Sequence, residues 1–141
     1  MKSFFLLLVC IASLSASDIR IVESKYSVSQ TIKNIEQIVT SKGFEVFTII
    51  DHKQNAKKVE MQMPEAKVIL FGNPKAGTKL MQEDIHAALD LPLRILVFQD
   101  SGVKIAYRDV SSLKVDFKLS NKKQLKAMDK GLDAIIDKAR K

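Results

Sequence analysis

Cysteine is nearly absent from this chain. The single one, Cys10, lies within the apolar run 4–14, which follows a basic second residue and precedes the small residues 15–17. A basic start, a short apolar run and a small-residue cleavage site are typical of a secretory signal peptide. We therefore predict that residues 1–17 are removed. The mature chain, 18–141, then has no thiol that can form a disulfide, act as a nucleophile or bind a metal ion.

Long hydrophobic runs are also missing. The apolar run 4–14 is shorter than the roughly 20 residues that span a bilayer, so we expect no stable membrane span once the signal peptide is gone. We predict a periplasmic or secreted protein. Two alternatives stay open at this point: a lipid attached to Cys10, and an N-terminal anchor that is not cleaved.

Aromatic side chains and histidines are few. The chain has no tryptophan and only two tyrosines, so it lacks the stacking surfaces of proteins that bind single-stranded nucleic acid. The net charge is +7, but lysines and aspartates are mixed near the C-terminus, as on a solvated helix face. We therefore predict no nucleic-acid partner. The two histidines, His52 and His86, have no zinc-type spacing, and we predict no metal site.

Two widespread catalytic signatures are absent as well. The chain contains no Gly-x-Ser-x-Gly sequence of the serine hydrolases. It also contains no Gly-x-Gly-x-x-Gly sequence of the dinucleotide-binding proteins. We predict that the protein uses no cofactor.

Apolar periodicity predicts the elements of the mature chain. The predicted strands are 19–26, 44–50, 67–72, 94–99 and 103–108, and the predicted main helices are 28–42, 78–89 and the segment from Asn121 onward. Strand 44–50 is apolar on both faces, which favours an interior position. Hairpin and crossover connections are mixed. This order predicts one α+β domain, a two-layer sandwich with a mainly antiparallel sheet and helices packed on one face.

The segment after the third predicted strand has the features of an anion site. Gly72 and Gly77 permit close backbone approach, Thr78 can cap the helix that follows, and Lys75 adds charge. We predict that this loop binds a small anionic or polar ligand, with unpaired N–H groups of Gly77 and Thr78 as donors. The alternative is a purely structural turn. The predicted ligand-binding residues are Asn73, Lys75, Gly77, Thr78 and Tyr107.

A second candidate is the pair Asp51 and His52, where a carboxylate can orient an imidazole for acid–base catalysis. If strands 44–50 and 67–72 run parallel, His52 and Asn73 emerge at one edge of the sheet. Asp51, His52, Asn73, Lys75 and Tyr107 then line one cleft. The alternative is that Asp51 caps a short helix and His52 is a polar turn residue.

Several short motifs together resemble one known family. In order along the chain they are Gly43-Phe44, Ile50-Asp51-His52, Ala56, Phe71-Gly72-Asn73-Pro74-Lys75, Gly77-Thr78, Leu80-Met81, Leu91-Pro92-Leu93 and Tyr107. The pattern is similar to the family called domain of unknown function 302 and covers roughly residues 26–139. The resemblance implies a compact α+β domain of the TT1751-like type. It implies no established activity.

These features favour a non-catalytic binding or accessory module for a small anionic or polar ligand or a partner segment. One alternative is an enzyme that uses His52 as a general acid or base. A second is a structural module that forms a homodimer through an exposed strand edge.

Overall fold

Five antiparallel strands form one sheet in residues 18–141, which are the residues that the computed structural model describes; the predicted signal peptide lies outside them. The strands are β1 (Ile19–Ser24), β2 (Glu45–Asp51), β3 (Ala66–Gly72), β4 (Leu93–Gln99) and β5 (Val103–Arg108). Their order across the sheet is β1-β5-β4-β3-β2. The β4–β5 hairpin turns at Ser101 and Gly102, which both have positive φ, as the sequence Asp-Ser-Gly predicts.

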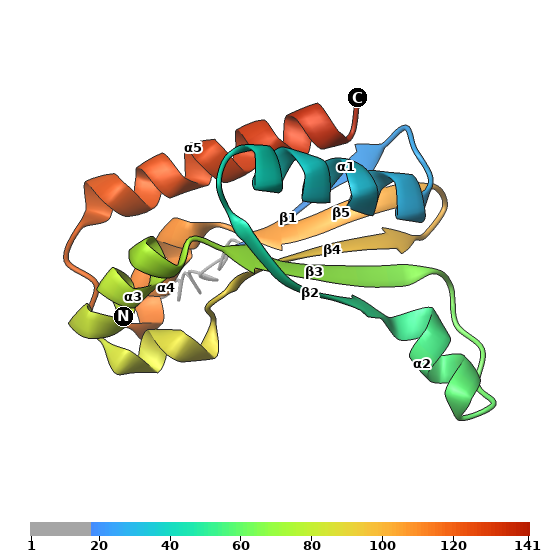
Figure 1. The fold of residues 1–141 in the computed structure, drawn as a ribbon, viewed down its shortest axis with the longest axis horizontal. Helices are drawn as coiled ribbons and strands as arrows, with labels where there is room; N and C mark the ends of the chain where they lie inside the picture. Colours follow the sequence, from blue (N-terminus) through green and yellow to red (C-terminus); the bar gives the residue numbers. More distant parts are fainter. Residues whose placement is uncertain (1–17) are drawn as a thin grey trace, which may run out of the picture.

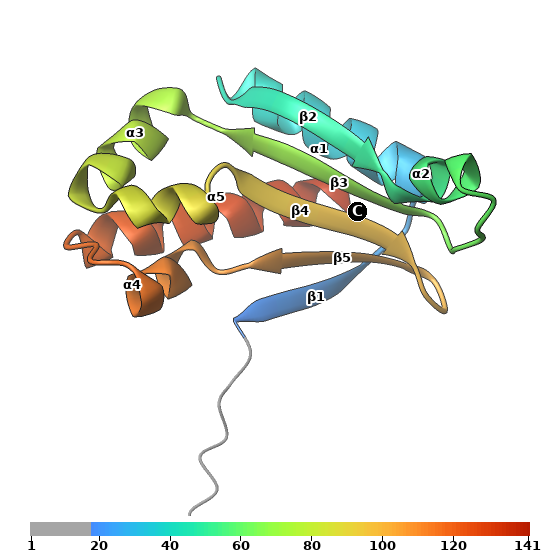
Figure 2. The ribbon, with the colours of Figure 1, turned by 90° about the horizontal axis from the view of Figure 1, so that it is seen from below.

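Two long helices cover one face of this sheet (Figure 1). The helices are α1 (Val28–Ser41), α2 (His52–Lys58), α3 (Pro74–Glu83), α4 (Leu113–Asp116) and α5 (Lys122–Ala139), with 3₁₀ turns η1 (Ile85–Leu89) and η2 (Val110–Ser112). Figure 2 shows the opposite face, where the strands lie in front of α1 and α5. The predicted α+β two-layer sandwich with helices on one face is therefore confirmed.

The core lies between the sheet and the stripes of α1 and α5. The stripe Val28, Ile32, Ile35 and Val39 is buried, as its helical spacing predicts. Ser27 caps α1 by accepting a hydrogen bond from Gln30 N, and Gly43 ends the turn after it with φ +77°. The buried core residues of the described part lie between 28 and 139 and form one cluster.

The interior position predicted for strand 44–50 is wrong. The strand β2 is an edge of the sheet, and it pairs antiparallel with β3. Its side chains Phe47 and Ile49 are 48% and 36% exposed, and a register shift lies between Val46 and Thr48. Apolar residues on both faces of this strand thus reflect a partly exposed edge. The bulge also disrupts the row of backbone groups that an edge offers to a second chain.

The helix predicted at 78–89 is two elements that meet at Asp84. Asp84 has an extended backbone, φ −149° and ψ 112°, and its carboxylate accepts hydrogen bonds from His86 N (3.0 Å) and Lys118 N (2.9 Å). The break changes the buried face. Leu80 and Ala87 are buried, whereas Ile85 and Leu89, which helical spacing assigns to the core, are 68% and 76% exposed.

We predict that Asp84 makes the fold sensitive to acid. The hydrogen bond from Lys118 N, followed by those from His86, lowers the pKa of Asp84 from 3.8 to about 2. A carboxyl group with a lowered folded-state pKa stabilises the fold above its unfolded pKa, and this contribution is lost as the pH falls from about 4 to about 2. Denaturant unfolding across this window should show a smaller acid loss of stability for Asp84→Asn than for the wild type.

The matched control is Asp116→Asn, because Asp116 is an exposed aspartate of α4. It should keep the wild-type acid profile. Equal profiles for the wild type and Asp84→Asn would contradict the role of Asp84.

Candidate functional site

The segment after β3 begins a helix at once. Asn73 is the N-cap of α3, and its Oδ1 accepts a hydrogen bond from Ala76 N at 3.0 Å. The carbonyl oxygen of Asn73 accepts one from Gly77 N at 2.9 Å. Pro74 occupies the first helical position, which suits a residue without an N–H group. Thr78 therefore lies inside the helix, and the predicted cap at Thr78 with free N–H donors at Gly77 and Thr78 is wrong.

An apolar cleft of about 240 Å³ lies beside this segment. Its walls are mainly side chains without polar atoms or with a thioether, namely Phe44, Phe47, Met81, Pro92 and Met128. Phe44 also contacts the buried ring of Phe71 edge to face, with the ring centroids 5.9 Å apart. The chemistry of the cleft favours an apolar group over an anion.

Segments that are far apart in the sequence meet at this cleft. Phe44 precedes β2, residues 72–78 link β3 to α3, residues 91–93 lead into β4, and Met128 lies on α5. A Cβ atom placed on Gly72 would be 3.7 Å from both Phe47 Cε2 and Pro92 Cβ, so these two side chains pack over the glycine. Five of the motifs that carry the family resemblance, those that contain Phe44, Gly72, Gly77, Met81 and Pro92, thus converge in space on one cleft.

The predicted ligand-binding residues are divided by the structure. Asn73, Gly77 and Thr78 line the cleft. Lys75 is exposed on α3 and does not line it, and Tyr107 lies on β5 in another part of the molecule. Sequence reasoning missed Phe47 and Met128, because only the fold brings them to this point.

The cleft predicted to join His52 with Asn73 does not form. Since β2 and β3 are antiparallel, Asp51 pairs with Lys67 at the start of β3, whereas Asn73 follows its end. At about 3.3 Å per residue, the seven residues of β3 separate the two sites by roughly 20 Å. The joint cleft required β2 and β3 to be parallel, and that condition is not met.

The carboxylate of Asp51 is engaged in structural contacts. Its Oδ1 accepts a hydrogen bond from Gln54 N at 2.9 Å and so caps α2, and its Oδ2 pairs with Lys67 Nζ at 3.3 Å. These contacts, with that from Gln54 N the largest, lower the pKa of Asp51. His52 is exposed at the first position of α2. The arrangement is that of a helix start, as the alternative interpretation proposes.

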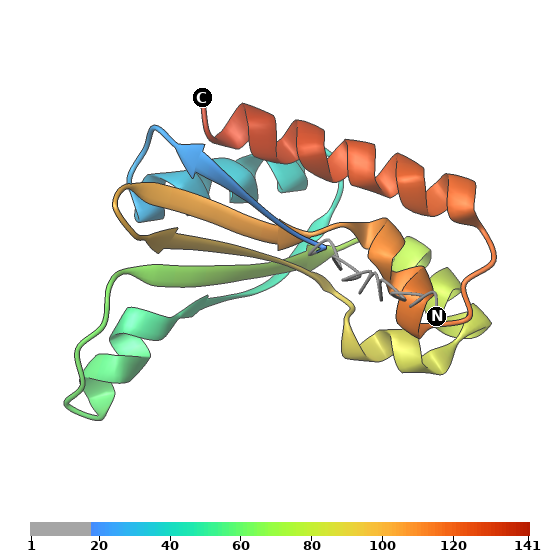
Figure 3. The same cartoon turned by 180° about the vertical axis from the view of Figure 1, so that it is seen from behind.

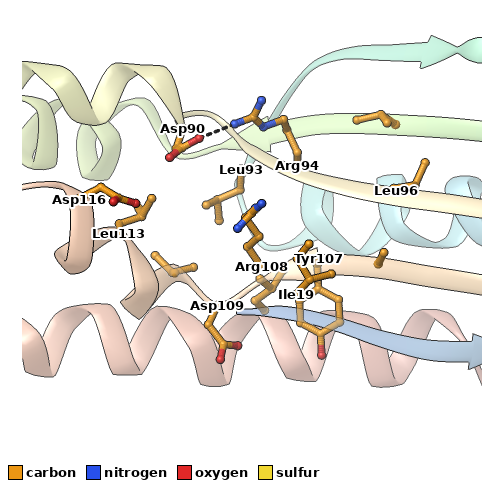
Figure 4. A pocket seen from close by; sticks show the side chains of 14 residues that line it. Ile19, Asp90, Leu93, Arg94, Leu96, Tyr107, Arg108, Asp109, Leu113 and Asp116 are labelled. Carbon is orange, nitrogen blue, oxygen red and sulfur yellow. Dashed lines mark hydrogen bonds and ion pairs between the residues drawn. The ribbon is translucent and has the colours of Figure 1, made fainter. Parts of the chain in front are cut away.

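A wider hollow of about 610 Å³ is lined by residues of β1, β3, β4 and β5, by the segment that contains α4, and by Leu132 of α5 (Figure 4). Arg94 and Arg108 border it, and each pairs with a carboxylate, Asp90 at 2.8 Å and Asp18 respectively. The bond to Arg108 is also the main cause that lowers the pKa of Asp18. Charge in this hollow is therefore largely compensated.

Tyr107 borders this hollow, but its hydroxyl points toward α5, away from the arginine pairs (Figure 4). The hydroxyl donates a hydrogen bond to Asp133 Oδ1 at 2.9 Å, and Arg20 Nη1 donates to the same carboxylate. Burial, followed by the bond to Asp133, raises the pKa of Tyr107 to about 12. Arg20 also pairs with Asp109. Tyr107 thus joins a network that holds β1 and β5 to α5.

Within residues 18–141, no cluster of three or more histidine, cysteine, aspartate or glutamate side chains is placed to hold a metal ion. None of the helices described there is both long and apolar enough for a membrane span.

Comparison with known proteins identifies the family. The family model described as Domain of unknown function DUF302 matches residues 20–139. The chain belongs to this family. A crystal structure of an uncharacterized conserved protein DUF302 from Bacillus stearothermophilus has the same fold, with a TM-score of 0.78, 20% sequence identity, and coverage of 89% of this chain and 100% of that chain.

Some curated relatives of this DUF302 domain are longer proteins. Over 94 residues, or 67% of this chain, it is 40% identical to "Fluoride-specific ion channel FluC 1" of Brucella suis biovar 1 and to "Fluoride-specific ion channel FluC 2" of Brucella melitensis biotype 1. The match covers 37% and 35% of those two proteins. The chain thus spans about a third of the length of these relatives.

The high pKa of Tyr107 can be measured directly in this DUF302 domain. The chain has two tyrosines, so a Tyr26→Phe variant leaves Tyr107 as the sole source of tyrosinate absorbance. We expect a titration midpoint near 12 in the folded protein. Because the folded state keeps this proton longer than the unfolded state, the free energy of unfolding should fall as the pH rises from about 10 to about 12.

The control is Tyr107→Phe, which should lack this part of the alkaline loss of stability. Circular dichroism at each pH establishes that the titrated protein is folded. A midpoint close to 10 in folded protein would show that the hydroxyl is not held as described.

Proposed function

We propose that this protein is a non-catalytic accessory domain whose cleft beside α3 receives an apolar side chain of a partner. The observation that carries the proposal is the convergence of residues 72–74, 76–78 and 91–93 with Phe44 and Met128 on one apolar cleft. The N–H group of Gly77 and Oδ1 of Asn73 are already hydrogen-bonded within the protein. For this reason the proposal replaces the small anion expected from the sequence by an apolar group.

The size of the cleft supports this choice. An apolar cavity of about 150 Å³ accepts a benzene ring, and the cleft measures about 240 Å³. One aromatic ring or one branched aliphatic side chain therefore fits. Transfer of such a side chain from water contributes about 1.5–3 kcal/mol, which suits reversible recognition of one anchor residue within a larger contact.

The Brucella relatives supply the class of partner. They are named as fluoride-specific ion channels, and a domain like this one makes up about a third of each. We infer that the rest of those chains carries the channel, and that the present domain serves a membrane transport protein in the same way. The predicted signal peptide agrees with a place in the cell envelope. A homodimer stays a prediction.

We predict that benzyl alcohol, as a probe, binds in the cleft. In residues 18–141 the methionines are Met61, Met63, Met81 and Met128, of which the last two line the cleft. Titration of protein labelled with ¹³C at the methionine methyl groups should shift the signals of Met81 and Met128. The exposed Met61 and Met63 are internal controls.

A variant at Gly77 separates binding from folding. A Cβ atom at Gly77 meets nothing within 4 Å, and the residue lies in α3 with no positive φ. Gly77→Ala should stabilise the protein by up to about 1 kcal/mol through helix propensity. Gly77→Leu should remain equally folded but fill the cleft and weaken probe binding by roughly tenfold, the loss of about 1.4 kcal/mol. Unchanged binding to Gly77→Leu would refute the site.

The link to transport has its own test. If the domain supports fluoride passage through a partner, cells that lack it should stop growing at lower fluoride concentrations than wild-type cells, with no change for chloride. Wild-type and Gly77→Ala genes should restore growth, whereas Gly77→Leu should not. Equal fluoride tolerance with and without the protein would contradict this partner class. Binding of an apolar group in the cleft would still be tested separately by the benzyl alcohol titration.

A further inference from the structure

Five lysines gather at one end of the molecule around a hollow of about 540 Å³. We call them the lysine patch: Lys114, Lys122, Lys123, Lys126 and Lys130. The first lies on α4 and the others on the first half of α5, and all five are exposed. Figures 1 and 3 show α4 and the start of α5 at the same end of the molecule. Among residues 18–141, only these lysines and Ala127 line the hollow.

The aspartates of α5 make their contacts with groups outside this patch. Asp129 accepts a hydrogen bond from Ser111 N at 3.1 Å, Asp133 is bound by Arg20 and Tyr107, and Asp137 is bound by Arg140. In residues 18–141, no member of the lysine patch forms an ion pair. The patch lysines and the aspartates of α5 thus form no ion pairs with one another in the described part of the chain.

The position of two patch lysines opposes helix stability. Lys122 and Lys123 occupy the first turn of α5, which holds no acidic residue. The N-terminal end of a helix carries partial positive charge, so cations there are unfavourable. Residues that destabilise their own helix or strand tend to be retained where they serve a function.

We propose that the lysine patch docks the domain on an anionic phospholipid bilayer. Lysine ammonium groups are compact point charges without the fork that binds one phosphate in a fixed geometry, and clusters of four to eight basic residues are attracted to anionic lipid surfaces. The relatives named as ion channels contain a segment that is 40% identical to this chain, and a channel lies in a membrane. This inference goes beyond the proposed function and does not depend on the apolar cleft.

Docking through the lysine patch would also fix the position of the apolar cleft relative to the bilayer. Ala127 lines both the hollow of the patch and an apolar groove of about 290 Å³. That groove shares Phe44, Leu93 and Met128 with the cleft. An apolar path therefore runs along α5 from the docking surface to the cleft, in reach of a partner segment that leaves the bilayer.

Vesicle flotation tests the proposal on residues 18–141, which hold the whole described core and lack the apolar run 4–14. The vesicles contain phosphatidylcholine with about a third phosphatidylglycerol, and neutral vesicles contain phosphatidylcholine alone. The test variant is Lys122→Gln, Lys123→Gln, Lys126→Gln. The matched control, Lys33→Gln, Lys42→Gln, Lys57→Gln, removes the same charge from exposed lysines elsewhere.

We expect binding to anionic vesicles only, and a decrease with added salt because exposed charges are screened. The patch variant should bind roughly a hundredfold more weakly, whereas the control should stay close to the wild type. An equal loss of vesicle binding in both variants would show that net charge alone causes the binding. It would contradict a specific role of the lysine patch. Equal binding to neutral vesicles, no vesicle binding at all, or tighter binding to a DNA oligonucleotide than to anionic vesicles would overturn the lipid assignment.

Discussion

The whole arrangement depends on burial of one face of an antiparallel sheet under α1 and α5. The buried stripes of the two helices, together with Ile69, Ile95 and Ile105 from the strands, form the core. The network of Tyr107, Asp133 and Arg20 fixes α5 to the edge formed by β1 and β5. Because the strands alternate in direction, every connection falls at one of two ends of the sheet. Residues of different connections can share a site only where those connections fall at the same end.

The long periodic elements could be predicted from the sequence, because their signals are local. The stripe of α1, its Ser27 cap, the hairpin at residues 100–102 and the Asn121 cap of α5 all depend on neighbours a few residues apart. Strand direction is not local. The joint cleft of His52 and Asn73 required β2 and β3 to be parallel, and the two strands are antiparallel.

The segment after β3 also shows that local sequence signals do not decide between alternative starts of a helix. Asn73, Pro74 and Thr78 each carry helix-start signals. The structure uses Asn73 as the cap and thereby occupies the amide of Ala76 that an anion would need. Asp84 then interrupts the helix through a bond to Lys118, which lies far along the chain. The sequence singled out this segment as a candidate site, whereas the apolar lining of the cleft beside it depends on Phe47, Pro92 and Met128, which only the fold brings together.

Apolar recognition at this cleft is most directly tested by intermolecular nuclear Overhauser effects between benzyl alcohol and methyl-labelled protein. Contacts from the aromatic ring protons to the methyl groups of Ala76, Met81 and Met128, all of which line the cleft, are the expected result. Contacts only to the exposed Met61 and Met63, or to residues around Arg94 and Arg108, would show that the cleft is not the receptor.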